Sequence, residues 1–213
     1  MTTPSNPQML PTVAEYLAAV AVRTTPAYQS TAGAPVVTVE PAPGWRAVAE
    51  ELIPTAYAVW ALPPEEDSKW AKAGWADNSV LLVSQLSKGV DSAAIMRCAF
   101  TDSRRMPEWY ELGSDIGDYE GWPSAQITGA YSVARLTFWS CTRYVLVEYG
   151  AGPFLLQLTV TTRVDASRDG SAIAASLSIQ APAEEPKPGT QTSSALVEPG
   201  TDANESGGIS FHI

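Results

Sequence analysis

Three neighbouring stretches of the chain between Asp118 and Thr162 favour β-strands and are separated by short turn signals. In the first stretch, Ala125 and Ile127 alternate with Gln126 and Thr128, and the third stretch repeats this pattern. Alternation with a period of two is typical of an antiparallel strand that buries one face. The pattern therefore predicts three successive antiparallel strands joined by short turns.

A further strand is expected at 79–86, where the run 80–83 is apolar at every position. Such a run indicates a central strand that is covered on both sides. Shorter strands are expected at 57–62 and at 36–39, the latter as an edge strand within a proline-interrupted segment. Residues 63–78, between the strands expected at 57–62 and 79–86, are expected to form an exposed loop.

Three helices are expected, at 13–22, 91–99 and about 169–178. The first has a capping box, because Thr12 is followed three positions later by Glu15. A strand that is apolar on both faces needs cover on each side. The sequence therefore predicts an α+β fold, an antiparallel sheet flanked by helices on both faces.

The composition changes abruptly after residue 180. Residues 181–208 contain four prolines, four glycines and six charged side chains, but no aromatic residue. This is too little apolar surface to offset the entropy of ordering the segment. We predict a domain at 12–179 between a disordered start (1–11) and a disordered acidic tail (180–213). Ile209, Phe211 and Ile213 in that tail form either a docking peptide for a sheet edge or a frayed terminus.

Charge and residue types exclude several classes of function. Thirteen basic and twenty-three acidic side chains give a net charge of −10, which would repel nucleic acid phosphates. The single histidine, His212, leaves little means for acid–base chemistry, so we expect neither an enzyme nor a cofactor. Cys98 and Cys141 are too far apart in sequence for a zinc pair, and either two buried free thiols or a disulfide would account for them.

Carboxylates provide the main candidates for catalysis or metal binding. Asp115, Asp118 and Glu120 lie close together in a segment that contains glycines. Three carboxylates can hold Ca²⁺, but their spacing does not match an EF-hand loop, so no metal site is predicted. They could also serve as the acid and base of a hydrolase, which would need a cleft to separate their pKa values.

Two arginines and four aromatic residues in one turn-rich connection are the candidate binding residues. They are Arg104, Arg105, Trp109, Tyr110, Tyr119 and Trp122. The arginines could clamp a phosphate or carboxylate, or they could satisfy carbonyls at the end of a helix. The aromatic rings could line a groove or an exposed contact surface, or they could pack in the core.

The amino terminus has no basic residue before Arg23, and no apolar run reaches the ~20 residues of a membrane span. These features predict a cytoplasmic protein without a signal peptide, a lipobox or a transmembrane segment. The alternative is export to the envelope, or secretion, without a recognisable amino-terminal signal.

Six segments occur in a fixed order along the chain. They are EYLAAVAVRTTP (15–26), GAPVVTVEPAPGW (33–45), SVLLVSQLSKGVD (79–91), RRMPEW (104–109), GWPSAQITGAYS (121–132) and FLLQLTVTT (154–162). Together they resemble the LpqN/LpqT family of actinobacterial lipoproteins. The resemblance implies a PsbP-like fold, an association with the mycobacterial cell envelope, and lipid or protein binding. It brings no catalytic residues. Members of that family typically begin with a signal peptide and a lipid-anchored cysteine, which are not recognisable here.

Three functions are therefore considered. The first is a non-enzymatic domain that binds an apolar or lipid ligand between sheet and helices. The second is a protein-interaction module that uses the aromatic surface or the C-terminal tail. The third is a carboxylate-dependent hydrolase.

Overall fold

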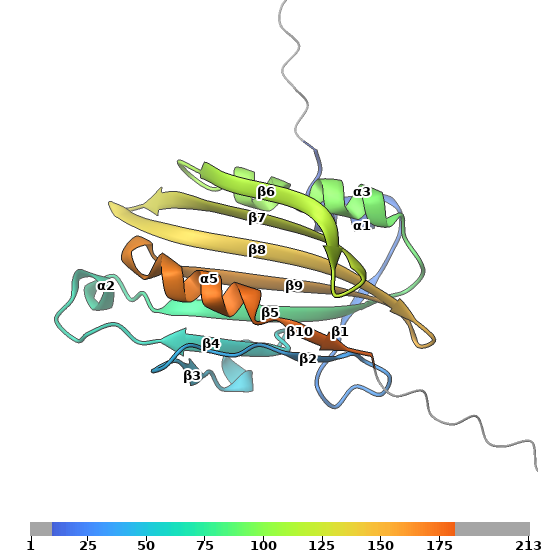
Figure 1. The fold of residues 1–213 in the computed structure, drawn as a ribbon, viewed down its shortest axis with the longest axis horizontal. Coiled ribbons are helices and arrows are strands. Elements are labelled where there is room, and N and C mark those ends of the chain that lie inside the picture. The colour runs from blue at the N-terminus through green and yellow to red at the C-terminus, as the bar shows by residue number, and fades with distance from the viewer. Residues whose placement is uncertain (1–9, 182–213) are drawn as a thin grey trace, which may run out of the picture. The chain divides into compact units, whose positions relative to one another are not determined.

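An antiparallel sheet organises residues 10–181, which are the residues that the computed structural model describes (Figure 1). Seven strands lie in the order β3-β4-β5-β9-β8-β7-β6, and β1 also pairs with β5. Their bounds are β1 Thr24–Pro26, β3 Arg46–Ala47, β4 Ala58–Leu62, β5 Asp77–Leu86, β6 Tyr110–Tyr119, β7 Trp122–Val133, β8 Leu136–Tyr149 and β9 Gly152–Arg163.

The three long strands predicted from the alternating pattern are β7, β8 and β9, and consecutive members pair directly. Tight turns join them. Ala134 and Arg135, between β7 and β8, both have a positive φ (51° and 68°). Glu120 and Gly121, between β6 and β7, do so too (50° and 85°). Two positive φ values in a two-residue loop suit the twist of antiparallel strands.

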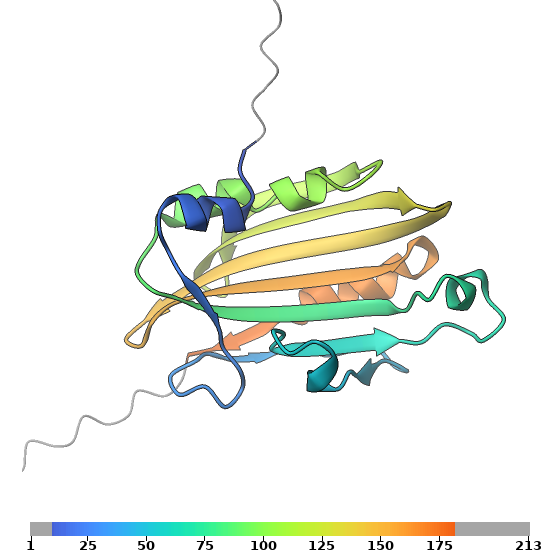
Figure 2. The ribbon, with the colours of Figure 1, turned by 180° about the vertical axis from the view of Figure 1, so that it is seen from behind.

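Helices cover both faces of the sheet, which confirms the predicted architecture (Figures 1 and 2). Their bounds are α1 Val13–Ala19, α2 Lys69–Lys72, α3 Ser92–Cys98, α4 Thr101–Arg104 and α5 Ser167–Ala175, with 3-10 helices at Glu50–Leu52 and Val164–Ala166. The capping box of α1 is present, because the Thr12 hydroxyl accepts from the Glu15 amide and the Glu15 carboxylate accepts from the Thr12 amide. At α3, the Asp91 side chain accepts from the Ala94 amide.

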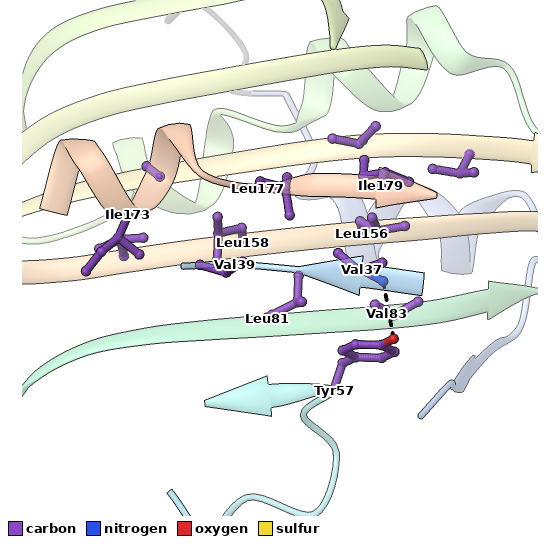
Figure 3. Packing of buried hydrophobic residues seen from close by; sticks show 14 of the residues in the cluster. Val37, Val39, Tyr57, Leu81, Val83, Leu156, Leu158, Ile173, Leu177 and Ile179 are labelled. Carbon is purple, nitrogen blue, oxygen red and sulfur yellow. Dashed lines mark hydrogen bonds between the residues drawn. The ribbon is translucent and has the colours of Figure 1, made fainter. Parts of the chain in front are cut away.

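The face under α5 carries the larger core (Figure 3). A separate two-stranded sheet, β2 (Val36–Thr38) paired with β10 (Ser178–Gln180), also packs here. The Tyr57 hydroxyl accepts a hydrogen bond from the Val37 amide at 3.3 Å, which ties β2 to the main sheet. The buried side chains include Val37, Val39, Leu81, Val83, Leu156, Leu158, Ile173, Leu177 and Ile179.

The opposite face is covered by α1 and α3. Val13 and Leu17 of α1 join Ile95 and Met96 of α3 in a second buried cluster, and the sheet contributes side chains of β7, β8 and β9. In Figure 2 these helices lie over the part of the sheet near β6 and β7. Along β5, Leu81 and Val83 are buried on the α5 side. On the α1 side Leu86 is buried but Val80 and Leu82 are only partly buried, so this face is less covered than predicted at these two residues.

The expected edge strand at 36–39 is present as β2, but it pairs with β10 and not with the main sheet, because Val37 and Val39 pack over the α5 face. Two other predictions of single elements are wrong. The expected loop at 63–78 contains α2, whose Trp70 is buried against Phe138. The turn-rich connection expected between helix and sheet contains β6. Its glycines and acidic residues interrupt the alternating pattern, and pairing with β7 overrides this weak propensity.

The predicted division into a domain at 12–179 and two disordered ends stays a prediction. Residues 1–9 and 182–213 lie outside the described residues, and so do the proposed docking residues Ile209, Phe211 and Ile213.

Gly129 of β7 allows the close approach that places the start of β6. A Cβ added there would lie 2.4 Å from Trp109 Cζ2 and 2.6 Å from the Tyr110 carbonyl oxygen. We expect Gly129→Ala to lower the free energy of unfolding by about 1–3 kcal/mol, because a well-packed site cannot absorb an added methyl group. Urea unfolding measures this change. Gly89→Ala is the matched control, since an added Cβ there meets nothing within 4 Å. Equal effects of the two substitutions would contradict the prediction.

Candidate functional site

Strand β6 forms one edge of the sheet and exposes apolar side chains. It pairs with β7 along one side, and no other strand within residues 10–181 pairs with its second side. The exposed fractions of Tyr110, Leu112 and Ile116 are 68%, 57% and 49%. Unpaired edges are normally protected, since their free N–H and C=O groups can pair with another chain. We call the unpaired side of Tyr110–Tyr119 the β6 edge.

Contacts at both ends hold β6 in place. At its start, the Trp109 ring packs over Gly129. At its end, the Tyr119 hydroxyl donates to the Leu177 carbonyl at 2.6 Å. The Glu120 carboxylate, in the turn after β6, accepts from the Ile179 amide at 2.7 Å. The start of the strand is therefore fixed to β7, and its end to Leu177 and Ile179 on the α5 side.

The middle of β6 contains a β-bulge and an ion pair. The register with β7 shifts between Glu111 and Gly113, which leaves Leu112 as the extra residue. The Glu111 carboxylate accepts from Arg104 Nε and Nη2 at 2.8 and 3.0 Å. The guanidinium of Arg104 is the main cause that lowers the pKa of Glu111 from 4.5 to about 2.

The three carboxylates singled out in the sequence diverge. Asp115 lies opposite Gln126 and Asp118 lies opposite Pro123, so the two aspartates belong to different faces of the sheet. Glu120 is engaged with the backbone of β10. Within residues 10–181 the structure brings no three His, Cys, Asp or Glu side chains together in a manner suited to a metal ion.

The predicted aromatic and arginine residues do not form one surface. Trp109 packs with the clusters on the α1 side, and Tyr119 and Trp122 pack with the cluster on the α5 side. Tyr110 alone among the four is strongly exposed. Arg105 Nη1 and Nη2 donate to the Glu15 carboxylate at 2.8 and 3.1 Å, so this arginine links α4 to α1.

A concave site lies beside α1, and none of its residues was predicted as a binding residue. We call it the α1 groove, and its volume is about 570 Å³. Its apolar lining comprises Val13, Ala14, Leu17, Ala18, Val22 and Leu155. Polar residues also line it, among them Asp102 of α4 and Tyr144 of β8. Burial raises the pKa of both side chains.

The two cysteines are free and buried, which decides between the two alternatives left open by the sequence. Cys98 belongs to the cluster on the α1 side and Cys141 to the cluster on the α5 side. Burial raises the pKa of both thiols, so both are protonated and unreactive at neutral pH.

Known proteins resemble this chain over most of the described region. The model of a family described as "Probable lipoprotein LpqN" matches residues 10–180, which confirms the resemblance seen in the sequence. The Proline-rich 28 kDa antigen of Mycobacterium tuberculosis is 27% identical over 137 residues, which is 64% of this chain and 42% of that protein. The Putative lipoprotein LpqT of the same species is 31% identical over 90 residues, 39% of this chain and 38% of that protein. The chain thus spans about two fifths of the length of these curated relatives.

Solved structures resemble the fold. The crystal structure of LpqN, described as involved in cell envelope biogenesis of M. tuberculosis, matches with a TM-score of 0.68 at 19% identity. The match covers 82% of this chain and 99% of that one. The PsbP protein of Synechocystis sp. PCC 6803 matches with a TM-score of 0.43 at 13% identity, over 73% of this chain and 92% of that one. In the described part of the chain, the helices are too short or too polar to cross a membrane.

The ion pair of β6 predicts a pH-dependent stability. Because the folded state lowers the pKa of Glu111, the ionised carboxylate stabilises the fold above about pH 4.5, and this contribution is lost as the pH falls toward 2. We expect Glu111→Gln to lower the free energy of unfolding by about 0.5–1 kcal/mol at pH 6, as for other partly exposed ion pairs. The difference from the unchanged protein should shrink as the pH falls from 4.5 to 2.

Urea unfolding at a series of pH values measures this difference. Asp118→Asn is the matched control, since Asp118 lies on the same strand and forms no ion pair within residues 10–181. A Glu111→Gln difference that stays constant down to pH 2 would refute the assignment.

Proposed function

The chain belongs to the family of the probable lipoprotein LpqN, and we propose that it is a non-catalytic binding domain that captures an extended, basic segment of another protein at the β6 edge. The proposal rests on one observation: strand β6 is ten residues long, is unpaired on one side, and exposes three large apolar side chains.

Edge pairing supplies both affinity and selectivity. An added strand forms backbone hydrogen bonds to the free N–H and C=O groups of β6, and its side chains lie beside those of β6. Leu112 and Ile116 provide apolar surface that a partner would remove from water. Because β6 is fixed at both ends, little conformational entropy is lost when a partner binds.

Charge favours a basic partner over a second copy of this chain. Asp115 and Asp118 form no ion pair within the described part of the chain. If two β6 strands paired in antiparallel fashion around their middle, these acids would lie near those of the other copy, and like charges across strands are destabilising. Lysine or arginine in an added strand would instead pair with Asp115 on one face of the sheet or with Asp118 on the other. The net charge of −10 would also speed the approach of a basic segment.

The cell envelope is the proposed location. A family of probable lipoproteins supports the alternative predicted from the sequence, export to the envelope, and gives no support to the cytoplasmic prediction. A related protein of the same fold is described as involved in cell envelope biogenesis. We also propose that the domain has no catalytic activity and uses no cofactor.

A second candidate function rests on the α1 groove. Its volume of about 570 Å³ falls within the range of small-molecule pockets, about 300–1,000 Å³. Six apolar residues line it, and the polar side chains of Asp102 and Gln157 lie among them. This arrangement suits the chain of an amphiphile, which agrees with the lipid binding implied by the family resemblance.

A model peptide tests binding at the β6 edge. The probe is a peptide of alternating lysine and valine with the ten-residue length of β6, and a glutamate–valine peptide is its counterpart. We expect the basic peptide to slow hydrogen exchange of the β6 amides that point away from β7, and the acidic peptide to have no effect. Combined Leu112→Ser and Ile116→Ser substitutions should weaken binding about thirtyfold, because partly burying each residue is worth on the order of 1 kcal/mol.

Leu52→Ser is the matched control, since Leu52 is also strongly exposed but lies in a 3-10 helix away from β6 in the sequence. It should leave the affinity unchanged. Binding of both peptides alike, or protection at another strand, would overturn the proposal.

A further inference from the structure

The α1 groove contains a carboxylate that has no charged partner. Asp102 lines the groove and forms no ion pair within residues 10–181. Its neighbours on α4 behave differently, because Arg104 pairs with Glu111 and Arg105 pairs with Glu15. Both arginines next to Asp102 are therefore occupied by other carboxylates.

The Asp102 side chain is exposed at the groove, and its surroundings raise its pKa. Burial is the main cause that raises its pKa, the charge of Glu15 raises it further, and Arg105 offsets only part of this effect. Tyr144 forms part of the groove and is 3% exposed, and the charge of Asp102 contributes to the raised pKa of its hydroxyl. An exposed carboxylate that lines a partly apolar groove and has no ion-pair partner within residues 10–181 can pair with the cationic head of a ligand.

The rest of the groove is mostly apolar. Val13 and Leu17 of α1 and Leu155 of β9 are buried side chains that also line it. Arg23 is the one cationic residue of the lining and forms no ion pair within the described residues. It follows α1 in the chain and lies next to β1, whereas Asp102 belongs to α4.

We propose that the α1 groove binds amphiphiles with a primary ammonium head, which donates hydrogen bonds to the Asp102 carboxylate while the alkyl chain lies against α1 and Leu155. This inference rests on the second candidate function, ligand binding in the groove. In this proposal Asp102 contacts the polar end of the ligand, and its negative charge makes the groove select cationic ligands. Hydrogen bonds to charged groups are stronger than those between neutral groups, so selectivity of roughly tenfold is expected.

Three probes of equal chain length test the inference: decylamine, decanoate and decyl maltoside, each below its micelle-forming concentration. NMR shifts of the Leu17 and Leu155 methyl groups report binding in the groove of the full chain. At pH 7 we expect decylamine to bind about tenfold more tightly than decyl maltoside, and decanoate to bind most weakly. Asp102→Asn should remove the preference for decylamine and keep the methyl shifts.

Asp67→Asn is the control for net charge, because it removes the same charge from the segment between β4 and β5. It should leave the preference intact. Equal affinities of the three probes would overturn the role of Asp102 and leave ligand binding in place. Tighter binding of decanoate would assign the polar end to Arg23 and overturn the proposal. If no probe shifts either methyl group, both the ligand-binding function and the inference fail.

Discussion

Strands β8 and β9 bury side chains on both faces, and the rest of the structure depends on keeping both faces from water. Tyr144 and Leu146 of β8 belong to the cluster under α1 and α3, whereas Val145 and Val147 belong to the cluster under α5. The covers come from opposite ends of the described chain, α1 before the first strand and α5 with β10 after the last. A partner can therefore reach the sheet only at an edge or where a cover ends. The β6 edge and the α1 groove are two such places.

The elements that build the two sites could be predicted from the sequence to different degrees. The alternation of β7 and β9, the capping box of α1 and the cap of α3 are local signals, and each led to the correct element. Strand β6 was missed because Gly113, Gly117 and its acidic residues break the apolar pattern. The local signal for it was the pair Glu120 and Gly121, which forms a two-residue turn directly before β7.

The predicted site residues were found in the correct region but with the wrong arrangement. Tyr110, Asp115 and Asp118 do lie on one exposed strand. Trp109 and Trp122 were separated because they flank β6 at its two ends and pack on opposite faces of the sheet. The α1 groove could not be predicted, since α1, α4, β8 and β9 meet there only after folding. Pairings over such sequence distances leave no local pattern.

Helix α4 connects the two sites. It has only four residues, too few to be stable alone, so its contacts determine its position. Arg104 binds Glu111 of β6, while Asp102 lines the α1 groove, and Arg105, directly after the helix, binds Glu15 of α1. A change of charge in the groove would therefore act on α4, which carries Arg104, the residue that pairs with Glu111 of β6. The negative charge of Asp102 attracts Arg105, which also pairs with Glu15. A ligand that neutralised Asp102 would remove this second attraction, so the ion pair between Arg105 and Glu15 would become stronger. In this arrangement one short segment, 102–105, contacts both the α1 groove and β6.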